Sequence, residues 1–152
     1  MNLRERIAAA LKDAMKSRDA ERLSTLRLIN AAIKDKEIAL RGEGGEAGLG
    51  DAEVMAILAR MVKQRQESAR AYEEGGRLEL AEKEREEIRV IEEFLPRQLD
   101  AAEVRDAIDA AIAETGASSI RDMGKVMAAL KAKHSGQMDF GAAGALVKER
   151  LA

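Results

Sequence analysis

The chain has 152 residues, of which 46% are hydrophobic and 36% are charged, and it contains no cysteine. A chain of this length can bury enough apolar surface to fold as one or two ordinary domains, so disorder is not expected. The lack of cysteine excludes disulfides, thiolate metal sites and cysteine nucleophiles. Three aromatic residues in all are too few for a platform that stacks single-stranded bases.

The formal net charge is −2, but the charged residues are unevenly distributed. Residues 1–41 hold ten Lys/Arg against six Asp/Glu, a net charge of +4. Residues 100–120 carry −4, and residues 121–152 carry +3. A nucleic-acid site needs only one locally basic face, and the chain has two such regions. Taken alone, the composition is explained better by ordinary solvated helix faces.

Helix-forming residues fill most of the chain and β-branched residues are sparse, so we predict an all-α fold. Apolar residues at steps of three and four predict four helices in the N-terminal part. Their expected ranges are about 3–17, 20–41, 52–74 and 77–94. Such lengths predict an N-terminal bundle of four helices that includes long hairpins.

Loops and caps divide these N-terminal helices. The segment Ser17-Arg18-Asp19 offers an N-cap to the second helix, and Asp51 offers one to the third. The glycine-rich stretch from Gly42 to Gly50 is expected to be a flexible loop, because glycine weakens helices. The inward side of the first helix is expected to include Met15.

Pro96 is the single proline and predicts the end of the fourth helix, because it lacks a backbone N–H and disfavours helical geometry in the residue before it. We therefore expect one domain over residues 1–96 and a small three-helix domain over residues 97–152. Asp100 and Glu103 form the pattern of a capping box, which opens a fifth helix through about Thr115. Two further helices are expected to be capped by Ser119 and Asp139.

No convincing catalytic constellation is present in the sequence. His134 is the one histidine, and no third group joins it and Ser135 in a recognisable motif. The glutamates between positions 82 and 93 are interleaved with lysine and arginine at the spacing of helical neighbours, which is typical of a solvated face. The glycine-rich loop lacks the following Lys-Ser/Thr of a phosphate-binding loop. We expect no metal, no cofactor and no catalysis by this chain alone.

The segment around Gly124 supports a more specific hypothesis. Glycine inside a helix costs about 1 kcal/mol relative to alanine, so Gly124 points either to close approach of a ligand or to a tight helix crossing. Lys125, Lys131 and Lys133 would then supply contacts to phosphates. The alternative is that the glycine serves packing and the lysines serve solubility.

A second basic feature lies further upstream. Arg27, Lys34 and Arg41 recur every seven residues and therefore lie along one side of the second helix. Solvent exposure explains this stripe better than ligand binding does.

Several motifs in order along the chain resemble the GatB/YqeY family, in its free-standing YqeY-like form. They are Lys83-Glu84-Arg85-Glu86-Glu87-Ile88, Phe94-Leu95-Pro96-Arg97-Gln98-Leu99, Asp122-Met123-Gly124-Lys125-Val126-Met127 and Leu146-Val147-Lys148-Glu149-Arg150-Leu151. The upstream segments Leu26-Arg27-Leu28 and Lys63-Gln64-Arg65-Gln66-Glu67-Ser68 resemble that family as well. The resemblance covers essentially the whole chain, and it is the ordered set of motifs that is specific.

The resemblance implies an all-α, two-domain protein related to the tail of the B subunit of the glutamine-dependent Glu-tRNA/Asp-tRNA amidotransferase. That tail helps to hold the tRNA, whereas the carbon–nitrogen ligase chemistry with glutamine as amide donor belongs to other domains. By the motif, Gly124, Lys125 and Met127 correspond to the family's Gly-x-Val-Met signature, and Gly136 to the glycine of the following turn. The chain departs from the pattern after Gly136, where Gln137-Met138-Asp139-Phe140 replaces a turn that is often more basic.

We therefore expect a cytoplasmic tRNA-binding accessory protein that contacts the phosphate backbone of structured RNA. The expected RNA-binding residues are Gly124, Lys125, Met127, Lys131, Lys133 and Gly136. No run of uncharged residues approaches the length of a membrane span, so no membrane contact is expected. The alternative is a protein-interaction module that docks on an amidotransferase subunit or an aminoacyl-tRNA synthetase. An enzyme with a site near His134 and the glutamate-rich helix is a third interpretation.

Overall fold

The structure is a computed structural model that describes residues 1–42 and 49–152, and every regular element in those ranges is helical, which confirms the all-α fold. The chain divides into two compact units, Met1–Leu95 and Pro96–Ala152. Most of the predicted glycine-rich loop lies outside the described residues. In the two described ranges, no helix is both long enough and apolar enough to cross a membrane.

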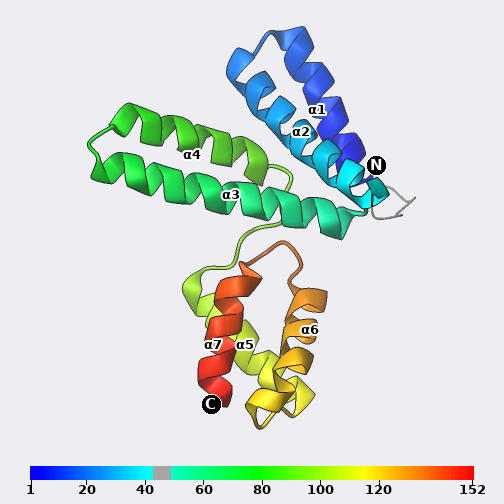
Figure 1. Cartoon of the computed structure of the whole chain (residues 1–152), viewed down its shortest axis with the longest axis vertical. Helices are drawn as coiled ribbons and strands as arrows, with labels where there is room; N and C mark the ends of the chain where they lie inside the picture. The colour runs from blue at the N-terminus through cyan, green and yellow to red at the C-terminus, as the bar shows by residue number, and fades with distance from the viewer. Residues whose placement is uncertain (43–48) are drawn as a thin grey trace. The chain divides into compact units, whose positions relative to one another are not determined.

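The N-terminal unit consists of two antiparallel helical hairpins (Figure 1). The first hairpin pairs α1 (Leu3–Ser17) with α2 (Ala20–Gly42), and the second pairs α3 (Asp51–Glu74) with α4 (Leu78–Glu92). Arg18 turns the chain between α1 and α2 in the left-handed region, with φ of 59°, and Gly76 does so between α3 and α4, with φ of 75°. Short connections of this kind force consecutive helices to lie side by side.

Both hairpins contribute to one apolar core, because each helix turns one apolar stripe inward. Its fully buried side chains include Ile7, Leu26, Ile29, Ile33, Val54, Leu58 and Ile91. Thr25 is also buried, and its hydroxyl donates a hydrogen bond to the carbonyl of Glu21 at 3.3 Å. Met15 was predicted to face this core, but its side chain is 55% exposed, so the inward stripe of α1 ends at Ala14.

The start of α3 differs from the prediction. Gly50 occupies the N-cap position, and Asp51 is the first helical residue. The Asp51 carboxylate instead accepts the backbone N–H of Leu3 at 3.0 Å, which is one of the N–H groups that α1 cannot satisfy internally. Asp51 therefore caps a helix that is distant in sequence, which spacing along the chain could not reveal.

The fourth helix ends earlier than expected, at Glu92 rather than near position 94. The backbone N–H groups of Phe94 and Leu95 bond to carbonyls three residues back, at 3.1 Å each, so the last turn tightens before Pro96. Proline disfavours helical geometry in Leu95, the residue before it, and the helix ends within the preceding turn.

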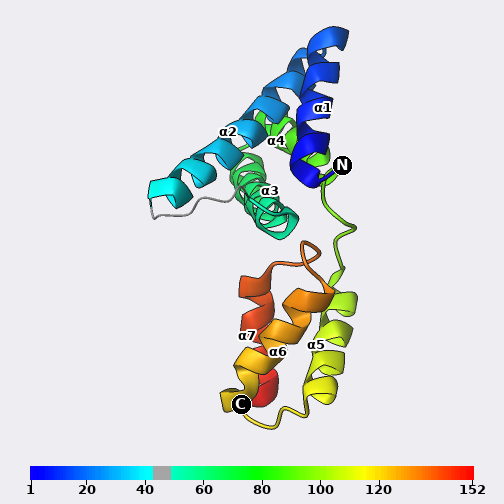
Figure 2. The same ribbon diagram turned by 90° about the vertical axis from the view of Figure 1, so that its right-hand side faces the viewer.

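The C-terminal unit contains three helices and one short 3-10 helix (Figure 2). They are α5 (Ala101–Thr115), η1 (Ile120–Asp122), α6 (Met123–Lys133) and α7 (Phe140–Leu151). Ile108, Val126, Leu130 and Val147 form the centre of a separate core. Ser119 was expected to cap the sixth helix, but it precedes η1, and Asp122 precedes α6 itself.

The predicted capping box of α5 is present. The Asp100 carboxylate accepts the backbone N–H of Glu103 at 2.8 Å, and the Glu103 carboxylate accepts that of Asp100 at 3.2 Å. The guanidinium of Arg97 donates two hydrogen bonds, of 2.9 and 2.7 Å, to the same Glu103 carboxylate. Asp139 caps α7 as predicted, accepting the backbone N–H of Gly141 at 2.9 Å.

Candidate functional site

The backbone is open to solvent at the first turn of α6. Gly124 is exposed, and a Cβ atom built on it would meet nothing within 4 Å in the described part of the chain. This result contradicts the tight helix crossing considered for Gly124. The close approach between α6 and α7 occurs at Gly144 instead, where a Cβ would lie 3.5 Å from Met123 Cε and 3.8 Å from Met127 Cε.

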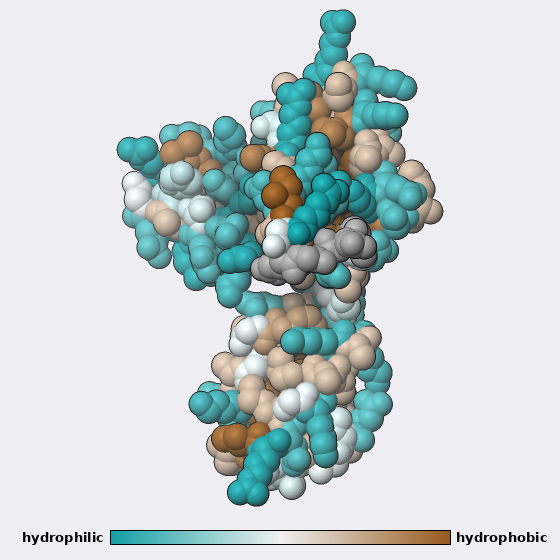
Figure 3. All heavy atoms as spheres, turned by 45° about the vertical axis from the view of Figure 1, so that its right-hand side comes forward, coloured by the Kyte–Doolittle hydropathy of each residue, from teal (hydrophilic) through white to brown (hydrophobic). Residues whose placement is uncertain are grey.

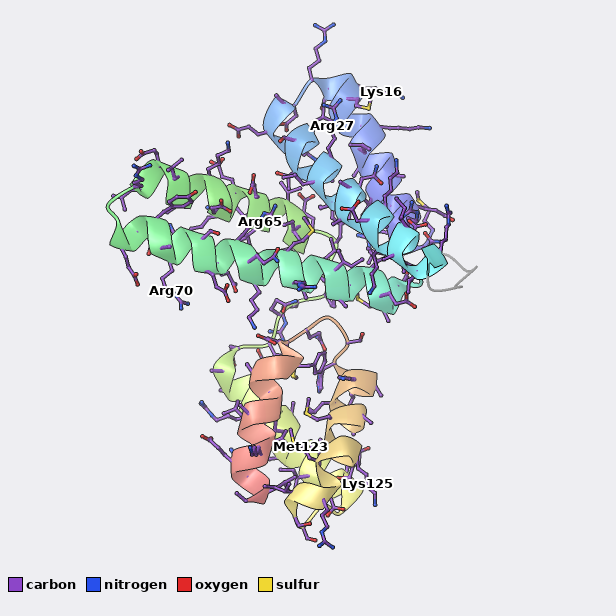
Figure 4. The ribbon with its side chains drawn as sticks, in the orientation of Figure 1. Lys16, Arg27, Arg65, Arg70, Met123 and Lys125 are labelled. Carbon is purple, nitrogen blue, oxygen red and sulfur yellow. The ribbon has the colours of Figure 1, made fainter. Side chains whose placement is uncertain are left out.

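One exposed side of α6 continues from Gly124. Ala128 and Lys131 follow Gly124 at steps of four and three, so the three residues lie on one side of the helix, and all three are exposed. Lys125 is exposed beside them, and Figure 4 shows it on the outer side of α6, whereas Met123 lies between α6 and α7. Met127 is half-buried against α7 and forms the edge of this side.

Helix α7 adds a lysine that the sequence analysis did not select. Lys148 is exposed and follows Gly144 by four residues, so it lies on the side of α7 that meets α6. The sequence does not single it out, because α7 begins with a run of small residues and only the contact at Gly144 shows which side of α7 meets α6. We refer to the exposed surface made by Gly124, Lys125, Ala128, Lys131 and Lys148 as the α6–α7 face.

Lys133 does not belong to the α6–α7 face. Its ammonium nitrogen lies 3.5 Å from a carboxylate oxygen of Glu114 on α5. Arg150 of α7 forms a corresponding ion pair with Asp109 of α5. Two acidic residues of α5 thus pair with cations of α6 and α7, whereas Lys131 and Lys148 have no ion-pair partner in the described residues.

The C-terminal unit is consequently polarised. Helix α5 carries four acidic residues against one arginine, a net charge of −3. Helices α6 and α7 together carry five basic residues against one glutamate, a net charge of +4. The view in Figure 3 shows residues of neutral to weakly hydrophobic hydropathy, in white and tan, over much of this unit, with hydrophilic residues, in teal, around them. Small residues bordered by cations leave room for an anionic polymer to approach the backbone.

The entry to α6 is fixed by Asp122. Its carboxylate accepts the backbone N–H groups of Ser118 at 3.0 Å and Ser119 at 3.4 Å. The bond from Ser118 is the main cause of the lowered pKa of Asp122, and Lys125 lowers it further. The ionised carboxylate holds the turn that presents Gly124.

The turn between α6 and α7 is held from within the unit. The carbonyl of Gly136 accepts a hydrogen bond from the Gln98 side chain at 2.6 Å, and the N–H of Leu99 donates to the carbonyl of Gln137 at 2.9 Å. Gly136 is buried and has φ of 74°, a conformation that favours glycine. His134 Nδ1 lies 3.1 Å from the side-chain oxygen of Gln137. Gly136 is therefore placed to shape the turn and lies apart from the exposed α6–α7 face.

The N-terminal unit has a cleft of its own. It lies between the start of α2 and α4 and has a volume of about 470 Å³. Its lining residues carry charges of both signs: Asp19, Ala20, Glu21, Arg22, Ser24, Thr25, Lys83, Glu86, Glu87, Arg89 and Val90. Arg22 pairs with Glu93 and Glu87 pairs with Arg65, so several of these charges already stabilise the fold.

The described residues contain no group of three or more potential metal ligands.

Comparisons of the sequence with known proteins identify a family. The model of the family described as Yqey-like protein matches residues 4–151. The chain is also 32% identical over 95 residues to the uncharacterized protein C22F3.15 of Schizosaccharomyces pombe, a match that covers 62% of this chain and 73% of that protein. Because the family model spans nearly the whole sequence, the chain belongs to the YqeY-like family.

Proposed function

We propose that this protein is an RNA-binding accessory factor, with tRNA as its first expected ligand, and that the α6–α7 face contacts the phosphate backbone. The observation that carries the proposal is the open helix backbone at Gly124, together with Lys131 and Lys148, which have no ion-pair partner among residues 1–42 and 49–152. Phosphate contacts position a nucleic acid without reading its bases, and this face offers cations and little else.

The chemistry of the chain favours a structured RNA over a single strand. Single-strand binders stack bases on aromatic side chains, whereas this chain has one tyrosine and two phenylalanines. Phe94, moreover, is buried with Arg6 over its ring, and so serves the core of the N-terminal unit. Double-stranded RNA is recognised mainly by shape and backbone contacts, which lysines can provide. The resemblance of the Gly124–Met127 segment to the amidotransferase tail supports tRNA in particular.

A pair of variants tests this assignment. We expect Lys131→Gln with Lys148→Gln to weaken tRNA binding and to reduce the slope of log K against log salt by about two, or about one per lost phosphate contact. Lys133→Gln with Arg150→Gln is the matched control, because it removes the same two charges from the same two helices, on the side that faces Glu114 and Asp109 of α5. The control should change the slope by much less than one.

Equal effects of the two variants would refute the α6–α7 face as the binding surface. A complex with an amidotransferase subunit or a synthetase that survives nuclease and moderate salt, without tRNA binding by the isolated chain, would instead support the protein-docking alternative.

A further inference from the structure

The N-terminal unit is also polarised. Residues 1–42, which contain the α1–α2 hairpin, hold ten Lys/Arg against six Asp/Glu, a net charge of +4. Residues 49–95, which contain the α3–α4 hairpin, hold eight Lys/Arg against twelve Asp/Glu, a net charge of −4. Excess positive charge is therefore confined to one hairpin of this unit.

Three cations of α2 form a continuous stripe. Arg27, Lys34 and Arg41 are all exposed and lie seven residues apart, a step that drifts by only about 20° around an α-helix. At a rise of about 1.5 Å per residue, the stripe extends over about 21 Å. Exposed cations occur on both helices of the hairpin, as Lys16 of α1 and Arg27 of α2 in Figure 4 illustrate.

The acidic residue nearest the stripe is already neutralised. Glu37 lies three residues after Lys34 and four before Arg41, and its carboxylate forms an ion pair with Arg4 of α1. The Glu37 side chain is only 16% exposed, so it faces the seam between the two helices. No ion pair engages Arg27, Lys34 or Arg41 in residues 1–42 and 49–152. Within the described residues, three cations in a row thus remain available to an external anion.

We infer that the stripe Arg27, Lys34 and Arg41 is a second binding surface for the phosphate backbone of structured RNA. This inference rests on the proposed function and adds a contact on the other unit of the chain. Duplex nucleic acid carries about one phosphate charge per 1.7 Å, so a 21 Å stripe faces about a dozen charges. Two of the three cations are arginines, whose guanidinium groups match phosphate with paired hydrogen bonds.

The test compares two triple charge reversals in the full-length chain, titrated against a labelled, deacylated tRNA transcript at several salt concentrations. The first is Arg27→Glu with Lys34→Glu and Arg41→Glu. The matched control is Arg60→Glu with Arg70→Glu and Arg77→Glu, which reverses three exposed cations of the same unit outside the α1–α2 hairpin. Both variants change the net charge equally, so long-range repulsion affects them alike.

We expect the stripe variant to reduce the salt slope by two to three units and the control to reduce it by less than one. Arginine, lysine and glutamate have similar helix propensities, so circular dichroism should show α2 intact. If the reversal unfolds the unit, the corresponding Gln variants provide the same comparison at half the change in charge. Equal slopes for stripe variant and control refute the inference while leaving the α6–α7 face in place. Absence of tRNA binding by the unmodified chain refutes the proposed function itself.

Discussion

Three glycines of the C-terminal unit lie in three different environments. Gly144 is buried against two methionines, Gly136 is buried in a turn with positive φ, and Gly124 is exposed with no atom near the position of a Cβ. The first two are explained by packing and by conformation. Gly124 has neither explanation, so its lack of a side chain is best understood as access to the backbone from outside.

Replacing Gly124 by alanine separates stability from binding. The added methyl group meets no clash in the fold and restricts the unfolded chain, so we expect the free energy of unfolding to rise by about 0.5–1 kcal/mol. The same methyl group lies on the α6–α7 face, and we expect tRNA affinity to fall. Thermal melts and anisotropy titrations of the Gly124→Ala variant measure the two effects. Increased stability with unchanged affinity would show that RNA does not approach this backbone.

At the scale of elements, the sequence predicted helix caps made by neighbouring residues, but not a cap made by a residue distant along the chain. The Asp100–Glu103 capping box and the Asp139 cap depend on neighbours within four residues, and both are present as predicted. Asp51 was assigned to its own helix, whereas it caps α1 from 48 residues away. Pro96 predicted the end of α4 to within two residues, and the difference lies in a last turn whose hydrogen bonds span three residues instead of four.

The same limit applied to the candidate site. Sequence reasoning grouped Lys131 with Lys133 because they are close in sequence, but residues two apart lie on different sides of a helix, and Glu114 of α5 pairs with the second lysine. Lys148 was missed because only the contact at Gly144 shows which side of α7 faces α6. The RNA-binding role of all these residues stays a prediction.

The start of α5 predicts a dependence of stability on pH. Two hydrogen bonds from Arg97, followed by the backbone N–H of Asp100, lower the pKa of Glu103 from 4.5 to about 2. Because the folded-state pKa is the lower one, this stabilisation is complete above about pH 4.5 and disappears as the pH falls through 2.

Glu103→Gln removes the ion pair with Arg97 while keeping a side chain that suits a capping box. We expect a slightly lower melting temperature than for the unmodified chain at neutral pH, with the difference shrinking as the pH falls from 4.5 toward 2. The comparison is made by thermal melts of both proteins across that range. A difference that stays constant with pH would show that the Glu103 carboxylate does not titrate as the structure implies.

At the scale of the whole molecule, the two units share one distribution of charge. In each unit a basic pair of helices is covalently joined to acidic helices: α1–α2 with α3–α4, and α6–α7 with α5. Acidic residues pair with part of the cations, through Glu93 with Arg22 and through Asp109 with Arg150. Among the residues that the structure describes, no ion pair engages Arg27, Lys34, Arg41, Lys131 or Lys148. A net charge of −2 therefore conceals two locally basic surfaces, which total composition could not reveal.

The most direct test of the account is the salt dependence of tRNA binding by the unmodified protein, measured by fluorescence anisotropy. We expect saturable binding with log K falling linearly against log salt by several units, because several phosphates are neutralised at once. Absence of saturable binding at low salt, or binding that does not weaken as salt rises, would contradict the central claim that this chain holds RNA by its phosphate backbone.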